Sequence, residues 1–160
     1  MARKIRIIAV GRSHDKLLLP LINDYESRLN RTLQIVWHIM PPKTDSNQKR
    51  GVIIAAETNS ITTNLKQTEY VILLDERGDQ MTSENFSEKL ELLYTSEKNI
   101  CFVIGGAFGV SESLRQRADM VLSLSQMVLP HQLVRLFLIE QLYRSHSIAS
   151  GGKYHHGPQS

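Results

Sequence analysis

The chain has 160 residues, of which 41% are hydrophobic and 22% charged, with a formal net charge of +3. This composition is typical of one soluble globular domain over residues 1–160, and the single cysteine excludes an intrachain disulfide. No run approaches the roughly 20 apolar residues of a membrane span, and Ile7–Val10 is too short for a signal peptide. We therefore expect a cytoplasmic protein with no membrane partner.

Apolar runs alternate with segments of helical character along the whole chain. The runs are continuous, as expected of strands that are covered on both faces. The expected strands are Ile5–Val10, Gln34–Met40, Tyr70–Leu74, Ile100–Ile104 and Met120–Leu124. The expected helices are Lys16–Leu29, Gln48–Leu65, Ser83–Tyr94, Ser111–Ala118 and Pro130–Ser147. This alternation predicts an α/β fold with a mostly parallel sheet and helices on both faces.

The last expected helix is apolar nearly all the way round. Its apolar residues are Leu133, Val134, Leu136, Phe137, Leu138, Ile139, Leu142 and Tyr143. A helix of this kind needs burial on every side. A homodimer interface supplies that burial, and a central position in the core is the alternative.

Two loops after strands have the composition of ligand-binding loops. Gly105–Gly109 follows a strand directly, so backbone can approach a ligand there, although a tight turn is the alternative. Ser123–Pro130 carries no charge and suits a flat heterocycle such as adenine, read by main-chain hydrogen bonds. Next to it, His131 begins the long helix, where the positive helix end disfavours its protonation; capping or packing is the alternative role.

The remaining reactive residue types have ordinary structural interpretations. Cys101 lies inside an apolar strand and is expected in the core. Asp75, Glu76 and Asp79 are expected to form a polar turn rather than a metal site. The histidines do not have the spacing of a zinc site, so we predict no metal. By contrast, the chain ends in Tyr154, His155 and His156, groups that handle protons near neutral pH, which suggests that the tail belongs to a site.

Charge is unevenly distributed along the sequence. Residues 1–66 contain eleven Lys and Arg against five Asp and Glu, whereas residues 67–128 contain five against ten. A basic N-terminal part beside an acidic middle favours one face for a polyanion, with scattered surface charge as the alternative.

Several segments, taken together, carry a family resemblance. They are Ile8-Ala9-Val10-Gly11, Tyr25-Glu26-Ser27-Arg28-Leu29, Leu74-Asp75, Phe102-Val103-Ile104-Gly105-Gly106, Ser123 to Gln132, Ile139-Glu140-Gln141-Leu142-Tyr143-Arg144 and Tyr154-His155. The chain resembles the RlmH-type (YbeA-like) large-subunit ribosomal RNA methyltransferases of the SPOUT superfamily. The likeness extends to about residue 156.

The resemblance implies a fold, a reaction and partners. It implies a C-terminal trefoil knot over roughly residues 70–156 and a homodimer. It also implies methyl transfer from S-adenosylmethionine to N3 of a pseudouridine in 23S rRNA, either free or in the assembled ribosome. The implied cofactor contacts are Leu74, Gly105, Leu124, Ser125, Gln126, Met127, Val128 and Leu129.

For the reaction itself we expect His155 to act as general base or base-orienting group, with Tyr154 as the hydrogen-bonding alternative. Both are expected to complete the cofactor site of the partner protomer. RNA contacts are expected at Arg144, His131, His156, Arg12 and Lys16. Arg135 is expected to meet phosphate or the cofactor carboxylate, or to pair with Glu140.

Three departures from the family pattern leave other functions open. His156 stands where the family has Lys or Arg, Val128 stands where threonine is common, and a Gly157–Ser160 extension follows the usual end. The alternatives are a noncatalytic RNA- or ribosome-binding factor of the same fold and a small-molecule methyltransferase.

Overall fold

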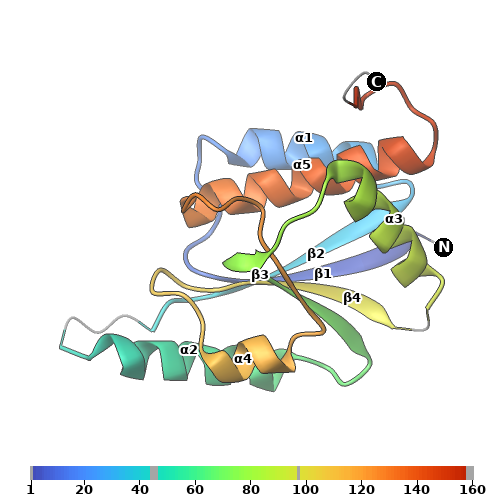
Figure 1. The fold of residues 1–160 in the computed structure, drawn as a ribbon. Coiled ribbons are helices and arrows are strands. Elements are labelled where there is room, and N and C mark those ends of the chain that lie inside the picture. Colours follow the sequence, from blue (N-terminus) through green and yellow to red (C-terminus); the bar gives the residue numbers. More distant parts are fainter. Residues whose placement is uncertain (1, 44–46, 97, 158–160) are drawn as a thin grey trace.

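The computed structural model describes residues 2–43, 47–96 and 98–157. Its centre is one five-stranded sheet whose strands are all parallel, in the order β2-β1-β4-β3-β5 (Figure 1). The strands are β1 (Arg3–Val10), β2 (Leu33–Met40), β3 (Glu69–Asp79), β4 (Asn99–Ile104) and β5 (Met120–Leu122). The helices are α1 (Leu19–Leu29), α2 (Arg50–Asn64), α3 (Ser83–Tyr94), α4 (Glu112–Arg117) and α5 (His131–Ala149). The predicted α/β fold is confirmed.

The sheet is covered on both faces, which explains why its strands are continuous apolar runs. Ile7 and Phe102 point into a core shared with α1, α3 and α5, whereas Ile8 and Val103 point into a second core shared with α2 and α4. Figure 1 shows these two groups of helices on opposite faces of the sheet. Neighbouring residues of a strand thus serve different cores, because side chains alternate across a sheet.

The largest differences between the observed and the predicted ends of elements are in β3 and α1. The polar turn expected at Asp75–Asp79 is wrong: β3 continues through these residues with a register shift, and Asp79 pairs with Leu122 of β5. Gly78 makes this possible, since a side chain there would lie 2.6 Å from the Val121 carbonyl oxygen. The first helix begins at Leu19 instead of Lys16, because Pro20 lacks an N–H and fits only the first turn.

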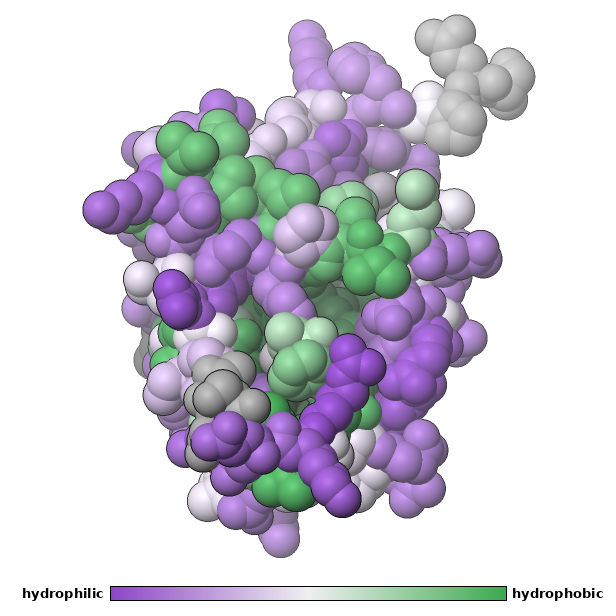
Figure 2. Space-filling view, turned by 90° about the vertical axis from the view of Figure 1, so that its left-hand side faces the viewer, coloured by the Kyte–Doolittle hydropathy of each residue, from purple (hydrophilic) through white to green (hydrophobic). Residues whose placement is uncertain are grey.

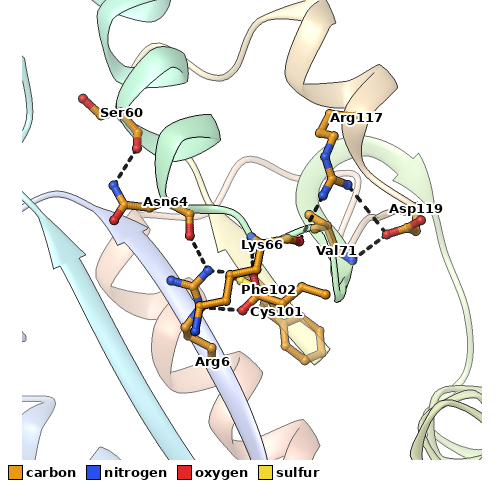
Figure 3. Close-up of polar contacts among 10 residues, drawn as sticks. Arg6, Ser60, Asn64, Lys66, Val71, Cys101, Phe102, Arg117 and Asp119 are labelled. Carbon is orange, nitrogen blue, oxygen red and sulfur yellow. Dashed lines mark hydrogen bonds and ion pairs between the residues drawn. The ribbon is translucent and has the colours of Figure 1, made fainter. Parts of the chain in front are cut away.

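The amino end of the sheet is closed by paired polar groups (Figure 3). Arg6 on β1 donates to both carboxylate oxygens of Glu69 at 2.7 Å and to the Asn64 carbonyl at the end of α2 at 2.6 Å. Asp119 accepts from the Val71 amide, which ties β5 to β3. Cys101 is buried nearby, and burial raises the pKa of its thiol to about 12, so the thiol is unreactive as predicted.

The last helix is not buried on every side within one chain. Leu138, Ile139 and Leu142 are buried against the core, but Leu133 and Phe137 are 43% and 39% exposed. Figure 2 shows hydrophobic side chains gathered on the upper part of the face over α1 and the beginning of α5, above a hollow in the surface. The exposed hydrophobic residues of this region include Leu17, Leu19 and Leu21. Among the described residues, no helix is both long and apolar enough to cross a membrane.

Candidate active site

A cavity of about 380 Å³ opens at the carboxyl ends of β3 and β4. Parallel neighbouring strands place the loops that follow them at one edge of the sheet, which is where ligands bind in such folds. Seven of the eight residues predicted to bind a cofactor line this cavity: Leu74, Gly105, Leu124, Ser125, Met127, Val128 and Leu129. Gln126 does not line it and instead donates to the Gln80 side chain at 3.3 Å.

One wall of the cavity is the uncharged loop between β5 and α5. Two hydrogen bonds within the loop hold its conformation. The Ser123 hydroxyl donates to the Ser125 carbonyl at 2.9 Å, and the Ser125 hydroxyl accepts from the Met127 amide at 3.0 Å. Met127 and Val128 are about four-fifths exposed, at 77% and 81%. A fixed main chain with apolar side chains at its rim can hold a flat heterocycle and exclude water from it.

The opposite wall is the glycine loop that follows β4. Gly109 has a φ of 87°, and its amide donates to the Gly106 carbonyl at 3.0 Å, which closes the loop. A side chain at Gly105 would lie 2.4 Å from Val110, and one at Gly106 would lie 2.2 Å from the Glu57 carboxyl. Neither position has room for a side chain, so this wall presents bare backbone to the cavity.

Asp75 lines the cavity, whereas the sequence predicted that it belongs to a polar turn. It is 9% exposed and accepts hydrogen bonds from the backbone and side chain of Arg77 at 2.9 to 3.2 Å. Arg115 approaches the same carboxylate at 3.6 Å. Burial alone would raise the pKa of Asp75, but the bonds and charge of Arg77, with the charge of Arg115, hold that pKa below its ordinary value. Asp75 is therefore an ionised, paired carboxylate.

His131 lines the cavity where α5 begins. Its Nδ1 is buried without a hydrogen-bond partner among the described residues, and Gly105 of the glycine loop lines the same cavity. The pKa of His131 is lowered, as predicted, and the causes are burial and then the charge of Arg135. The ring is neutral near pH 7, so it offers a lone pair or a hydrogen-bond donor rather than a charge.

Arg135 lies in a place that the sequence did not indicate. Its side chain is fully buried, and one guanidinium nitrogen donates to the Arg12 carbonyl at 2.8 Å and contacts His14 Nδ1 at 3.3 Å. The expected contact with phosphate and the expected pair with Glu140 are both wrong, because Arg135 has no exposed surface and Glu140 holds Arg144. Burial lowers the pKa of Arg135.

The loop between β1 and α1 is fastened to α5 by Arg135 and by its neighbour Gln132. Gln132 accepts from the Asp15 amide at 3.0 Å and donates to the Ser13 carbonyl at 3.1 Å. Arg12 and Lys16, two of the predicted RNA contacts, are exposed on this loop. The loop therefore presents two exposed cations beside the beginning of α5.

The predicted catalytic tail lies in a polar network on its own chain. The Tyr154 hydroxyl donates to Glu140 at 3.1 Å and lies 3.0 Å from the Tyr25 hydroxyl. Burial, the Tyr25 hydrogen bond and Glu140 raise the pKa of Tyr154, so its phenol is neutral. His155 contacts Arg144 through Nδ1 at 3.2 Å and Glu84 through Nε2 at 2.8 Å. His156 is exposed, and residues 158–160 of the extension lie outside the described residues.

The tail follows the carboxyl end of α5 (Figure 1), whereas the cavity lies at the amino end of this helix, where His131 lines it. None of the described tail residues lines the cavity, and His131 is thirteen residues before Arg144. At about 1.5 Å per residue, that separation is roughly 20 Å along the helix. One chain thus contains both parts of the expected site but holds them apart.

Comparison with known proteins identifies the family of this chain. Residues 3–155 match the family model described as Predicted SPOUT methyltransferase. The chain belongs to the SPOUT methyltransferase family. It is 39% identical over 158 residues to ribosomal RNA large subunit methyltransferase H of Christiangramia forsetii, with 95% of this chain and 98% of the relative covered. It is 40% identical over 157 residues to the protein of the same name from Acetivibrio thermocellus, with 95% and 99% covered.

A solved structure supports the fold of this SPOUT chain. It is described as a probable methylase family protein from Haemophilus influenzae Rd KW20, with a TM-score of 0.56 and 14% identity, and the match covers 100% of this chain and 73% of the other. Within the part of the chain that the structure describes, no group of three or more His, Cys, Asp or Glu side chains is placed to hold a metal ion.

Sequence reasoning did not place Arg50 of α2 and Asp75 of β3 in the cavity lining. It also missed Glu57 of α2, which does not line the cavity but lies against Gly106, a residue that does. The Arg50 guanidinium lies 4.8 Å from the centre of the Phe108 ring and lines the cavity. The sequence offered no signal for Glu57 or Arg50, because α2 is only weakly amphipathic and its partner loop is far away in the chain.

Proposed function

We propose that this chain methylates N3 of a pseudouridine in large-subunit (23S) ribosomal RNA, in the cytoplasm, with S-adenosylmethionine as methyl donor. The observation that carries the proposal is the cavity of about 380 Å³ between an uncharged loop and a glycine loop, in a chain of the SPOUT methyltransferase family. The relatives named above act, by their names, on large-subunit ribosomal RNA. RNA is therefore the substrate class that we propose for this chain.

The residues around the cavity fit the proposed cofactor. The main chain of residues 124–129 is uncharged and braced by Ser125, so it offers hydrogen-bonding groups to an adenine ring. Gly105 and Gly106 keep side chains away from the opposite wall, which leaves room for the rest of the molecule. When bound, S-adenosylmethionine supplies an electrophilic methyl group on a positively charged sulfur. The residues of the cavity orient the donor and exclude water.

The acceptor nitrogen needs a group that handles its proton. N3–H of a pseudouridine lies between two carbonyls and is weakly acidic, so removal of its proton exposes a lone pair for in-line attack. We assign this task to His155, as base or as the group that orients the nitrogen, with the neutral Tyr154 phenol as a hydrogen-bond donor. Arg144 can only donate, so His155 accepts at Nδ1 and carries its proton on Nε2 toward Glu84.

With its proton in this position, His155 cannot act as a base while the tail keeps its present contacts. The Nδ1 lone pair is occupied by Arg144, so His155 becomes a base only after that contact is exchanged for the substrate. Because the tail is roughly 20 Å along α5 from the cavity of its own chain, we propose that it serves the cavity of a partner. The exposed Leu133 and Phe137 beside the cavity supply apolar surface for such a homodimer.

RNA binding is proposed on the basic loop beside α5. Arg12 and Lys16 are exposed there, whereas Arg144 is engaged by Glu140 and lies over the Tyr154 ring. Phosphate attraction by the two exposed cations weakens with salt. The C-terminal trefoil knot of the family and contacts of His131 and His156 with RNA remain part of the proposal.

The test is mass spectrometry of 23S rRNA from cells with and without this protein. The proposal expects one methylated pseudouridine that disappears with the gene and returns when purified protein and S-adenosylmethionine are added to the deficient rRNA or ribosomes. Unchanged rRNA would favour the noncatalytic binding factor. Labelled methyl found only in small metabolites would favour a small-molecule enzyme.

A further inference from the structure

Helix α2 supports the glycine loop from behind with two charged side chains. Arg50 stacks on Phe108, and Glu57, seven residues later and so on the same side of the helix, reaches Gly106. A side chain at Gly106 would lie 2.2 Å from Glu57 Oε2 and 2.7 Å from Oε1. The carboxyl thus fills the space that the glycine leaves. Gly106 touches Glu57 and also lines the cavity, so the carboxyl is close to the cavity across bare backbone.

Glu57 differs from the other buried carboxylates of the described chain. Glu69 is held by Arg6 at 2.7 Å, and Asp75 is held by Arg77. Glu57 is 5% exposed, and its Oε2 has no hydrogen-bond partner among the described residues. A buried carboxyl without a donor is costly, so such groups usually have a ligand or a task.

The charged groups on the elements around Glu57 are already engaged. Arg50 of α2 lies over Phe108, and Arg115 of α4 is shared between Asp75 and Glu112. Burial raises the pKa of Glu57. A positive charge that arrives in the cavity therefore favours the ionised carboxyl, and loss of that charge favours the protonated one.

We propose that Glu57 is the counter-charge for the positively charged sulfur of the methyl donor. It favours the charged donor over the product S-adenosylhomocysteine, whose sulfur is neutral. This inference rests on the proposed function. Donor binding releases a proton from Glu57 to solvent. Methyl transfer removes the positive charge from sulfur, Glu57 takes up a proton again, and the neutral product leaves more readily.

The test compares the two ligands on the full chain. Calorimetric titrations of wild type and Glu57→Gln with S-adenosylmethionine and S-adenosylhomocysteine are run in two buffers of different ionisation enthalpy. We expect Glu57→Gln to weaken the donor about tenfold, equivalent to about one pKa unit of coupling, and to leave the product nearly unchanged. Proton release with the donor should be present in wild type and absent in the variant. The matched control Glu88→Gln makes the same charge change on the exposed surface of α3 and should alter neither affinity.

Each outcome decides a different point. Equal weakening of both ligands, or of neither, would overturn the role of Glu57 while leaving the proposed cofactor intact. Failure of wild type to bind either ligand would remove the proposed cofactor itself. Should Glu57→Gln not fold, Glu57→Asp keeps the charge and must keep the donor-to-product affinity ratio. A ratio that collapses in Glu57→Asp contradicts the inference.

Discussion

At the amino end of the sheet, the half-buried Arg6 lies against the buried Glu69, and the guanidinium holds both carboxylate oxygens. At the carboxyl end, Glu57 and Arg135 are buried with polar atoms that have no partner among the described residues, and so is His131 Nδ1. Unpaired buried groups cost free energy, which selection tolerates where a ligand or a substrate completes them. The difference separates the end of the sheet that holds the fold together from the end at which we propose that the methyl donor binds.

The largest effect on methyl transfer is expected from removal of the tail, which makes its hydrogen bonds outside the cavity of its own chain. Truncation after Gly152 should lower methyl transfer about 10²- to 10⁴-fold, because it removes Tyr154 and His155 from the acceptor. Binding of S-adenosylmethionine should stay near the wild-type value, since none of the described tail residues lines the cavity. Rate and calorimetric measurements on the same preparation check both. A truncated protein with full turnover would remove the tail from the mechanism.

Disruption of the Arg6–Glu69 pair at the amino end of the sheet should lower stability rather than activity. Glu69→Gln leaves the half-buried Arg6 without a counter-charge and should lower the free energy of unfolding by about 3 kcal/mol in urea titrations. The matched control Glu91→Gln breaks the exposed pair with Arg3 and should change it by about 0.5 kcal/mol or less. Equal changes in the free energy of unfolding for the two variants would mean that the Arg6–Glu69 pair does not stabilise the amino end of the sheet.

At the carboxyl end of the sheet, replacement of Arg135 should change RNA binding rather than lower stability. Arg135→Met removes a buried charge that has no acidic partner, so stability should change by less than about 1 kcal/mol or increase. The loop with Arg12 and Lys16 loses its anchor, so the salt dependence of rRNA binding should fall by about one or two phosphate contacts. Filter binding at several salt concentrations measures this, with exposed Arg31→Met as control. Strong destabilisation with an unchanged salt slope would contradict the assigned role.

The smallest expected effect is on pH dependence. Burial and then the charge of Arg135 lower the pKa of both His131 and His14 in the folded chain. Below the ordinary histidine pKa of 6.5 the unfolded chain binds protons that the folded chain does not, so stability falls as the pH drops. Arg135→Met removes one of the two causes, so its melting temperature should fall less steeply between about pH 7 and pH 5. Identical slopes would show that Arg135 does not act on these histidines.

Much of the frame could be predicted from the sequence because local patterns determine it. Continuous apolar runs such as Ile5–Val10 gave the strands, and the strand–helix alternation gave a parallel sheet. The end of β3 could not be predicted, because Asp75 and Asp79 are polar residues and only the approach of β5 at Gly78 extends pairing there. Polar composition normally indicates a turn, and the tertiary contact outweighs it.

The site was predicted in part for a similar reason. The uncharged loop and the glycines could be identified because their composition is unusual, and they do line one cavity. Arg135 and Glu57 could not be found, since a charged residue in a helix is normally assigned to the surface. Their burial depends on loops more than forty positions away in the chain, at Arg12 and Gly106, which no helical periodicity reports.

The most direct test of the account is methyl transfer by mixed dimers. Protomers truncated after Gly152 are combined with Gly105→Val protomers, whose cavity wall must shift because even a Cβ there would lie 2.4 Å from Val110. Each homodimer alone should be inactive, and the mixture should recover methylation of 23S rRNA, because one intact cavity meets one intact tail. A mixture as inactive as its parents, although both protomers fold and pair, would contradict the sharing of the site between two chains.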